Sequence, residues 1–455
     1  MGQISCLTLS DNSYVRIFVY FFYCLEGCYN SCWSTVNPRI KDELSLSDVN
    51  YGWTIFMFSL GCVIITPFAS WSLQSFGSKQ SVGTGSFLMC LAITTVALSR
   101  SFSILLIAML YFGLSQGLMD ISMNSAAVLT EFVAKKPILG SFHGSYSISA
   151  AIGAQIAAIF TMMSVSPLNI YLIYTIVGVL LSLISYDKLY DFNKELEITT
   201  LNDKSYANQT DDKVNATETE NNKKSIFSVK NPVLYLGLVG FLAALGEVSI
   251  TSWATIYFSR VLSINGVAST LGYTFFMIFM GTGRLLCDKI RARIGRQRLV
   301  FLSGILLIVG CLAIFLSSMV TRTNSANVIV AIIGFSLVGC GCSTLIPTMY
   351  SSAGHLQGVH SGTSISNVSF FTNLGTIFSG PLIGGISQLL NLQAAILVLG
   401  CMCGSTTILS YFIPYELNEI DKSKKSIRNH VVSYASVATN DVIIAPLLEE
   451  LDDAK

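Results

Sequence analysis

The sequence has few charged residues: 12% of its 455 positions are Asp, Glu, Lys or Arg, whereas a soluble globular chain carries about 25%. The net charge is only +1, so no basic or acidic excess points to nucleic acid, and no nucleic-acid partner is expected. Two common enzyme motifs are also missing, because the sequence holds no HExxH and no P-loop. We therefore expect no catalysis and no bound metal or cofactor.

What the sequence has instead is a series of long apolar runs. Hydrophobic residues make up 52% of the chain and the mean hydropathy is +0.61, more apolar surface than one water-soluble core could hide. A membrane-spanning helix needs about 20 mostly apolar residues, whereas a membrane-spanning strand needs only about ten. Twelve runs of helical length occur, at 15–36, 51–73, 81–99, 103–129, 138–162, 168–187, 232–259, 266–287, 298–319, 326–349, 362–389 and 392–413.

A polar segment divides these runs into two sets of six. It is poor in aromatic residues and rich in Asn, Asp, Glu, Thr and Lys, a composition typical of a disordered linker. We predict an all-α membrane protein with two pseudo-symmetric six-helix bundles. The predicted parts are an N-terminal bundle (1–188), a cytoplasmic linker (189–230), a C-terminal bundle (231–413) and a cytoplasmic tail (414–455).

Basic residues are unevenly distributed around the runs. If both termini are cytoplasmic, the external loops hold only five of the 27 Lys and Arg residues, namely Arg39, Lys41, Arg100, Arg260 and Arg322. Cytoplasmic loops of membrane proteins carry an excess of Lys and Arg. The distribution therefore predicts a multi-pass membrane protein with both termini in the cytoplasm, in either the plasma membrane or an endomembrane.

Two loops carry parts of a known signature. After the eighth run the sequence reads Gly283-Arg284-Leu285-Leu286-Cys287-Asp288-Lys289, and then Arg293-Ile294-Gly295-Arg296. It resembles the Gly-x-x-x-Asp-Arg-x-Gly-Arg-Arg loop of the major facilitator superfamily, although in strict register Ala292 replaces the acid and Asp288 the first glycine. The loop after the second run keeps only Gly77 and Lys79 of that pattern, with Gln74 in place of the acid.

Four further stretches resemble one branch of that superfamily, the bacterial inner-membrane facilitators related to the fucose permease. They are Trp33 to Leu46, Gly117 to Asn124, Gly246 to Tyr257 and Gly339 to Gly354. The resemblance implies the twelve-helix major facilitator fold and secondary transport, coupled to an ion. It also implies that carboxylates on the first and fourth helices handle the proton, but it indicates no particular substrate.

Four ionisable residues lie inside the predicted helices: Glu26, Asp120, His143 and Glu247. A charged residue at the centre of a membrane helix costs about 2.5–3.5 kcal/mol on insertion scales, so each calls for a functional explanation. We predict that Glu26, Asp120 and His143 bind and release a transported proton near neutral pH. The alternative for each is a structural hydrogen bond to a neighbouring helix.

Polar and aromatic residues near these acids are predicted to bind the substrate. Glu247 lies in the seventh run, the pseudo-repeat partner of the first, so Glu26 and Glu247 are expected to face one cavity from opposite halves. Two carboxylates suit a cationic or polyhydroxylated ligand. Trp253 falls about 240° round the helix from Glu247, at about 100° per residue. The predicted substrate-binding residues are Glu26, Asn30, Trp33, Asn124, Glu247, Trp253, Tyr273, Asn367 and Asn373.

A third group is predicted to act in gating. Arg284 and Asp288 are four residues apart at the cytoplasmic end of the eighth run, with Arg293 beyond them. Side chains at this spacing are neighbours on a helix. An ion pair there that forms in one state and breaks in another would shift the balance between the states.

Taken together, the residues predict a secondary transporter that moves a small polar organic solute by proton-coupled symport. A sugar-like molecule is the first candidate for this solute. Its expected partners are that solute, a proton or other ion and the lipid bilayer, and the expected functional unit is a monomer. Two alternatives stay open. A drug or metabolite antiporter is disfavoured because the fifth run lacks a Gly-Pro pair. A non-transporting nutrient sensor is disfavoured because the sequence retains its intramembrane charges.

Overall fold

The computed structural model describes residues 9–134, 138–191, 193, 195, 232–319, 324–354 and 361–413. All regular elements in these ranges are helices. The first half contains α1 (Leu9–Glu43), α2 (Asp48–Ile64), α3 (Thr66–Ala97), α4 (Phe102–Ala134), α5 (Leu139–Met162) and α6 (Pro167–Tyr186). The second half contains α8 (Pro232–Ile256), η2 (Tyr257–Val261), η3 (Gly266–Thr270), α9 (Leu271–Ile294), α10 (Arg296–Leu316), α11 (Asn324–Gly354), α12 (Ser361–Leu389), α13 (Leu392–Gly404), α14 (Thr406–Leu409) and η4 (Ser410–Phe412).

Helix coincides with each of the twelve predicted runs, but several ends differ. The run expected at 51–73 is interrupted after α2, at Ile65, because Pro67 begins a new helix at the first turn of α3. The eighth run was expected to end near 287, yet α9 continues to Ile294 through a basic turn. Helical hydrogen bonding does not stop where hydropathy falls, so apolar run length marks the buried part of a helix and not its end.

Two glycines give the halves the same turn at corresponding places. Gly77 divides α3 with φ 80° and ψ 175°, and Gly295 separates α9 from α10 with φ 83° and ψ 162°. This backbone conformation is almost restricted to glycine, because a Cβ atom would clash with the chain. The two positions are those that the loop signature of the sequence also picks out, which fits the predicted repeat of the two halves.

Eight helical stretches in the described part of the chain are long and apolar enough to cross a membrane. One of them, Asp48–Ala97, is 50 residues long and contains both α2 and α3, whereas one crossing needs about 20 residues. The helices α1, α9 and α12 are not among the eight. Polar and ionisable residues lower their hydropathy, and several of these residues lie in the cavity described below. The count of twelve crossings stays a prediction.

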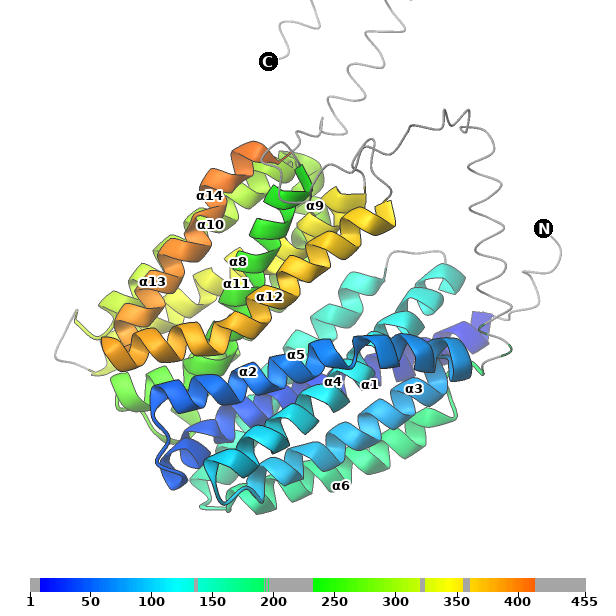
Figure 1. The fold of residues 1–455 in the computed structure, drawn as a ribbon, viewed down its shortest axis with the longest axis horizontal. Helices are drawn as coiled ribbons and strands as arrows, with labels where there is room; N and C mark the ends of the chain where they lie inside the picture. Colours follow the sequence, from blue (N-terminus) through cyan, green and yellow to red (C-terminus); the bar gives the residue numbers. More distant parts are fainter. Residues whose placement is uncertain are drawn as a thin grey trace, which may run out of the picture.

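The helices form two bundles that meet at one end and diverge at the other (Figure 1). Within the first bundle α1 packs on α5 and α3 packs on α4; within the second, α8 packs on α12 and α10 on α11. The main contacts between the bundles are α2 on α12 and α5 on α9. The bundles meet at the end where α1 leads into α2 and where α12 finishes, here called the closed end (Figure 1).

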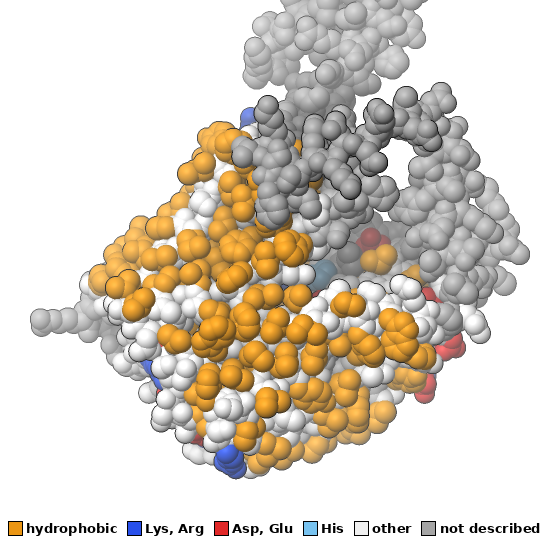
Figure 2. All heavy atoms as spheres, in the orientation of Figure 1, with side chains coloured by type: hydrophobic (Ala, Val, Ile, Leu, Met, Phe, Trp, Pro, Cys, Tyr) orange, Lys and Arg blue, Asp and Glu red, His pale blue; other side chains and the backbone are white. Residues whose placement is uncertain are grey.

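The outer surface of the bundles is largely apolar (Figure 2). Large hydrophobic side chains are exposed along several helices, among them Ile107 on α4, Leu183 on α6 and Ile329 on α11. A soluble monomer rarely exposes apolar patches of more than a few hundred Å², so lipid is the medium that suits this surface. With the composition, it shows an all-α membrane protein.

The start of the predicted linker packs against the first bundle. Tyr190 is buried, and Asp191 pairs with Lys79 at 2.7 Å between Oδ1 and Nζ. Glu195 Oε2 accepts a hydrogen bond of 2.7 Å from the backbone N–H of Ser78, just after the turn at Gly77. The prediction of a disordered segment from 189 onward is therefore wrong for these first residues, because they supply acids to the basic turn of α3. Residues 196–230 and the tail from 414 lie outside the described residues.

Candidate functional site

A polar cavity of about 380 Å³ lies between the two bundles, and Figure 2 shows a recess between them. The lining comes from α1, α2, α4 and α5 of the first bundle and from α8, α9 and α12 of the second. Of the residues predicted to bind substrate or proton, eight line this cavity: Glu26, Asn30, Trp33, Asp120, His143, Glu247, Tyr273 and Asn373. Glu26 and Glu247 are thus contributed to one cavity by opposite halves.

The first bundle contributes two acids to the cavity. Glu26 on α1 is only 4% exposed, and Asp120 on α4 interacts with it electrostatically. Asn124, one turn along α4, donates a hydrogen bond of 2.9 Å from Nδ2 to Oδ1 of Asp120. Tyr23 in turn donates to Oδ1 of Asn124 at 2.6 Å. This chain of hydrogen bonds fixes the orientation of the Asp120 carboxylate through its Oδ1 oxygen.

Asn124 therefore holds Asp120 and is not among the described residues that line the cavity. Its amide is used up by Asp120 and Tyr23, which leaves it little capacity for a ligand. His143 on α5 lines the cavity, and the ring of Tyr23 packs edge-on against its imidazole at 5.2 Å between centroids.

The second bundle contributes an ion pair. Arg284 Nη2 lies 2.9 Å from Oε1 and 3.0 Å from Oε2 of Glu247, and both residues line the cavity. The predicted partner of Arg284 was Asp288, one turn further along α9. In the structure Arg284 reaches from α9 to Glu247 on α8. The Asp288 side chain lies outside the described residues, so its pairing with Arg284 stays a prediction. Arg293 is exposed in the last turn of α9 and is not among the described residues that line the cavity.

Trp253 and Asn367 are likewise absent from the described cavity lining. Trp253 is 1% exposed and packs edge-on against Tyr51 at 4.8 Å, near the closed end. Its position follows from helix geometry, since it points to a different side of α8 from Glu247. Asn367 lies on α12 almost two turns before Asn373, which does line the cavity.

Tyr23, Gln116 and Tyr146 are among the polar cavity residues that sequence reasoning missed as functional residues. Tyr146 OH accepts a hydrogen bond from Nδ2 of Asn30 at 3.1 Å, which links α5 to α1. Each of the three lies three or four residues from a predicted site residue on the same helix. The helical repeat was therefore the available signal, because residues at this spacing share a face.

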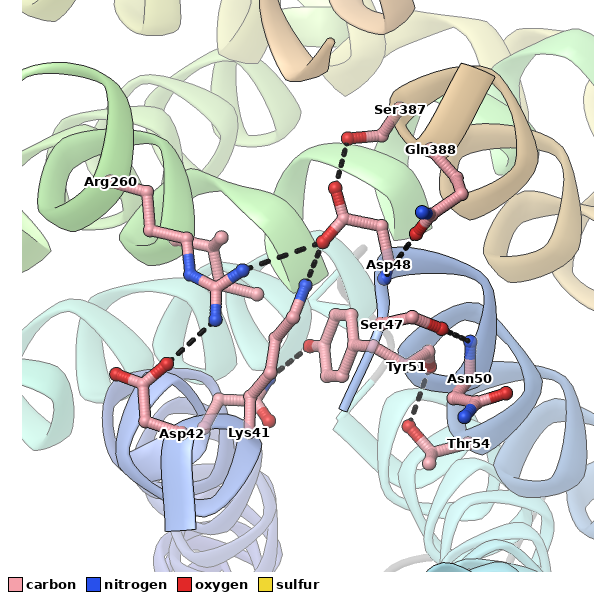
Figure 3. A network of polar contacts seen from close by, with 12 residues as sticks. Lys41, Asp42, Ser47, Asp48, Asn50, Tyr51, Thr54, Arg260, Ser387 and Gln388 are labelled. Carbon is pink, nitrogen blue, oxygen red and sulfur yellow. Dashed lines mark hydrogen bonds and ion pairs between the residues drawn. The ribbon is translucent and has the colours of Figure 1, made fainter. Parts of the chain in front are cut away.

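The closed end is fastened by charged and polar contacts between the bundles (Figure 3). Lys41 of α1 pairs with Asp48 of α2, and Ser387 of α12 donates to the second oxygen of Asp48. Arg260, from the second bundle, lies 2.6 Å from Asp42 and 3.5 Å from Asp48. Carboxylates of the first bundle thus bind a cation and a hydroxyl of the second.

Aromatic and backbone groups seal the same end. The Lys41 ammonium lies 5.2 Å from the ring centre of Tyr51 and 5.1 Å from that of Trp253, an arrangement that attracts a cation to the ring faces. Tyr51 OH donates to the backbone oxygen of Ser252 at 3.0 Å. Below this layer, Ser34 on α1 donates to the backbone oxygen of Thr251 on α8 at 2.6 Å.

Glycines bring the backbones of α2 and α12 into contact at the closed end. A Cβ atom added to Gly52 would lie 2.4 Å from the carbonyl oxygen of Gly380, and one added to Gly384 would lie 2.4 Å from that of Asp48. Such distances are well below contact distance, so only glycine allows this approach. The cavity therefore lies between two bundles that are sealed together at one end.

The chain matches the sequence model of the Major Facilitator Superfamily over residues 19–362. The chain belongs to this superfamily. It is similar to an uncharacterized MFS-type transporter of Yersinia pestis, with 24% identity over 378 residues, or 83% of this chain and 89% of that protein. It is also similar to the membrane protein MosC of Rhizobium meliloti, with 23% identity over 83% of this chain and 85% of that protein.

Solved structures of superfamily transporters share the fold. The nucleoside transporter NupG matches with a TM-score of 0.63 and 13% identity, over 87% of this chain and 97% of that one. A bacterial homologue of the human lysosomal transporter Spinster, in an inward-facing and unoccupied conformation, matches with a TM-score of 0.60 and 14% identity, over 89% of this chain and 96% of that one. The expected family and the all-α membrane fold are thus confirmed, and the protein is a superfamily transporter.

Proposed function

We propose that this transporter moves a small polar organic solute by alternating access, in symport with protons. The first candidate for the solute is a sugar-like molecule. The observation that carries the proposal is the cavity between the bundles, where acids of both halves meet while the closed end is sealed. Intramembrane acids are costly and mark ion or substrate pathways. In this proposal the bundles rock about the cavity, so that the closed end opens when the other end closes.

The proposed proton site is the pair Glu26 and Asp120, with His143 beside it. Two carboxylates that interact in one buried place share a proton more readily than they both ionise, because like charges repel in a low dielectric. Three features support this assignment. Glu26 is nearly fully buried, Asp120 is oriented by Asn124, and no Lys or Arg from the described first bundle lines the cavity.

The proposed substrate site is the part of the cavity toward the second bundle. It combines amide groups of Asn30 and Asn373, the ring of Trp33 and the pair of Glu247 with Arg284. The phenolic OH of Tyr273 is buried there without a hydrogen-bond partner among the described residues. A buried polar group of this kind favours a ligand that supplies its own hydroxyl groups. Since NupG is a nucleoside transporter, a nucleoside belongs among the solutes to test.

We further propose that both termini are cytoplasmic, so that the closed end faces the outside and the cavity opens inward. The distribution of Lys and Arg supports this orientation. The proposed functional unit is the monomer, because one chain supplies both halves of the cavity. The choice between plasma membrane and endomembrane is left to localisation of a tagged chain.

The test is uptake by proteoliposomes of labelled D-glucose, L-fucose, uridine, L-alanine and choline, each with and without an inward proton gradient. We expect gradient-driven accumulation of a hydroxylated neutral probe, since three acids in the lining disfavour an anion. Selective accumulation of choline or alanine would contradict the sugar-like assignment. Accumulation that ignores the proton gradient would contradict symport.

The companion test replaces the two acids singly, as Glu26→Gln and Asp120→Asn. Each should abolish gradient-driven accumulation, because an amide cannot bind the proton. Glu43→Gln is the matched control, since Glu43 ends α1 at an exposed position outside the cavity lining. Uptake that stays proton-driven in both cavity variants shows that the proton binds elsewhere.

A further inference from the structure

Arg284 occupies a special place in the charge balance of the cavity. Among the described residues that line the cavity, it is the only Lys or Arg, and three carboxylates line the same cavity: Glu26, Asp120 and Glu247. When all three are ionised and His143 is neutral, the lining carries a net charge of −2. Its own bundle supplies one of these acids, Glu247, and the other bundle supplies Glu26 and Asp120.

The bonding of Arg284 leaves it free to interact with more than Glu247. Both Glu247 oxygens lie against one nitrogen, Nη2, at 2.9 and 3.0 Å. A guanidinium has five N–H donors in a planar fork. Within the described part of the chain, Nη1 and Nε of Arg284 have no hydrogen-bond partner. The side chain is 14% exposed, so it borders the cavity and is not locked in a core.

Arg284 also acts across the cavity on the first bundle. Its charge interacts with Asp120 on α4 and with His143 on α5. The cavity around Arg284 on α9 and Asp120 on α4 holds further titratable groups, and together these residues come from six helices. The further groups are Tyr23 and Glu26 on α1, Cys62 on α2, His143 and Tyr146 on α5, Glu247 on α8 and Tyr273 on α9. Among the groups that belong to this described lining, only Arg284 carries a permanent positive charge.

We propose that Arg284 couples proton release to the return of the empty carrier, by moving from Glu247 toward Asp120 when the pair of Glu26 and Asp120 loses its proton. This inference rests on the proposed proton symport and adds the residue that transmits it. Loss of the proton places one more negative charge opposite the guanidinium. The free N–H groups of Arg284 then bridge the second bundle to the first, which draws the open end together.

The direction of the effect suits a symporter. Proton release into the cytoplasm favours the bridge and therefore closure of the open end, which returns the empty site to the outside. A proton bound from outside neutralises the acid pair and releases Arg284 to Glu247, so the open end separates again. By linkage, whatever holds Arg284 at Glu247 also favours proton binding at the acid pair.

The test measures the open end directly and requires no substrate. Gln80 and Arg298 are exposed positions at the corresponding turns of the two bundles. Each is replaced by a non-canonical amino acid to which a nitroxide label is attached. Thiol labelling is not suitable, because the chain has 12 native cysteines. In the wild type, raising the pH from about 5 to about 8 should shift the distance distribution toward the shorter population by about fivefold or more, the lower end of typical coupling between two sites. Arg284→Gln should abolish this pH response.

Two further variants keep the test decisive if Arg284→Gln folds poorly. Arg284→Lys keeps the charge and should retain part of the response, and Glu247→Gln frees Arg284 and should favour the short distance even at low pH. A wild-type response in Arg284→Gln, or no effect of Glu247→Gln, overturns the proposal. The proposal is also overturned if the wild type shows proton-driven uptake but its label distances do not change with pH. Failure of the proposed symport is a separate result. It would appear as proton-driven uptake that persists in both Glu26→Gln and Asp120→Asn.

Discussion

Replacement of Gly384 by Ala probes the contact that closes one end of the transporter. The added Cβ atom would lie 2.4 Å from the carbonyl oxygen of Asp48 and 3.2 Å from Cα of Gly52, both on the opposite bundle. The nearest obstacle is a backbone atom, so no side-chain rotation relieves the clash. Normal contact begins near 3.4 Å, and α2 and α12 must therefore separate by about 1 Å.

In the proposed alternating-access cycle, the cost falls on only one of the two states. Overpacking of one methyl group in a close-packed contact costs about 1–3 kcal/mol, which corresponds to a change of about 5- to 150-fold in an equilibrium constant. The clash exists only while the bundles touch at the closed end. Within α12 itself alanine is a better helix former than glycine by up to about 1 kcal/mol. The variant should therefore fold well and open the closed end more often.

The assay is a distance measurement across the closed end, with labels at the exposed positions Leu98 and Met319 on opposite bundles. Gly385→Ala is the matched control, since a Cβ atom at this adjacent residue of α12 meets nothing within 4 Å. We expect Gly384→Ala to enrich the longer distance and Gly385→Ala to match the wild type. Equal shifts in both variants, or a shift in neither, would refute the reasoning.

Three further predictions concern other parts of the structure. Asp48→Asn removes the carboxylate that binds Ser387 and Arg260 of the second bundle, and the same closed-end labels should report a shift toward the open population. The expected size is about 2 kcal/mol, because Asp48 keeps 22% exposure. Gly77→Ala forces alanine into φ 80° and ψ 175° and should cost about 1–3 kcal/mol of stability, measured as thermal unfolding in detergent and compared with Gly385→Ala. Tyr23→Phe removes the hydroxyl that orients Asn124, and it should move the pH midpoint of proton-driven uptake with unchanged expression; an unchanged midpoint would remove Tyr23 from the proton site.

The fold was largely predictable because lipid imposes a simple rule on the sequence. Each helix must bury a long apolar stretch, so run length alone located helices such as α6 and α10. The ends were less predictable. The break at Ile65 needed attention to Pro67, and the extension of α9 to Ile294 continues beyond the apolar run into a basic turn. Hydropathy reports the medium around a residue, whereas helix ends depend on local backbone chemistry.

The site was predictable where one residue carried its own signal. An ionisable side chain in an apolar run is expensive, which singled out Glu26, Asp120 and Glu247, and the structure lines one cavity with all three. The choice among polar and aromatic neighbours was weaker. Trp253 could have been excluded, because its angle on the helix already separated it from Glu247. Which face of each helix meets the cavity depends on packing with the other helices, and one sequence does not contain that rotation.

Arg284 shows that local spacing does not reveal every charge partner. Asp288 is four residues away on the same helix, whereas Glu247 is 37 residues away on another. Lys79 behaves in the same way: the acid missing from its own loop is replaced by Asp191, from beyond α6. In both cases the partner lies outside the local segment: Glu247 is on a neighbouring helix, and Asp191 is in the segment that follows α6.

The division of charge between the bundles has a mechanical consequence. In the described lining of the cavity, the first bundle contributes the acids Glu26 and Asp120, while the second contributes the guanidinium of Arg284 together with Glu247. At the closed end the acids Asp42 and Asp48 again belong to the first bundle, and the cation Arg260 to the second. Attraction between the bundles is thus available both at the closed end and in the cavity. A carrier that alternates needs these attractions to compete, because a carrier held together at both places at once would not move. In the proposed symport, protonation of Glu26 and Asp120 weakens only the attraction in the cavity, which gives the proton control over which end is held.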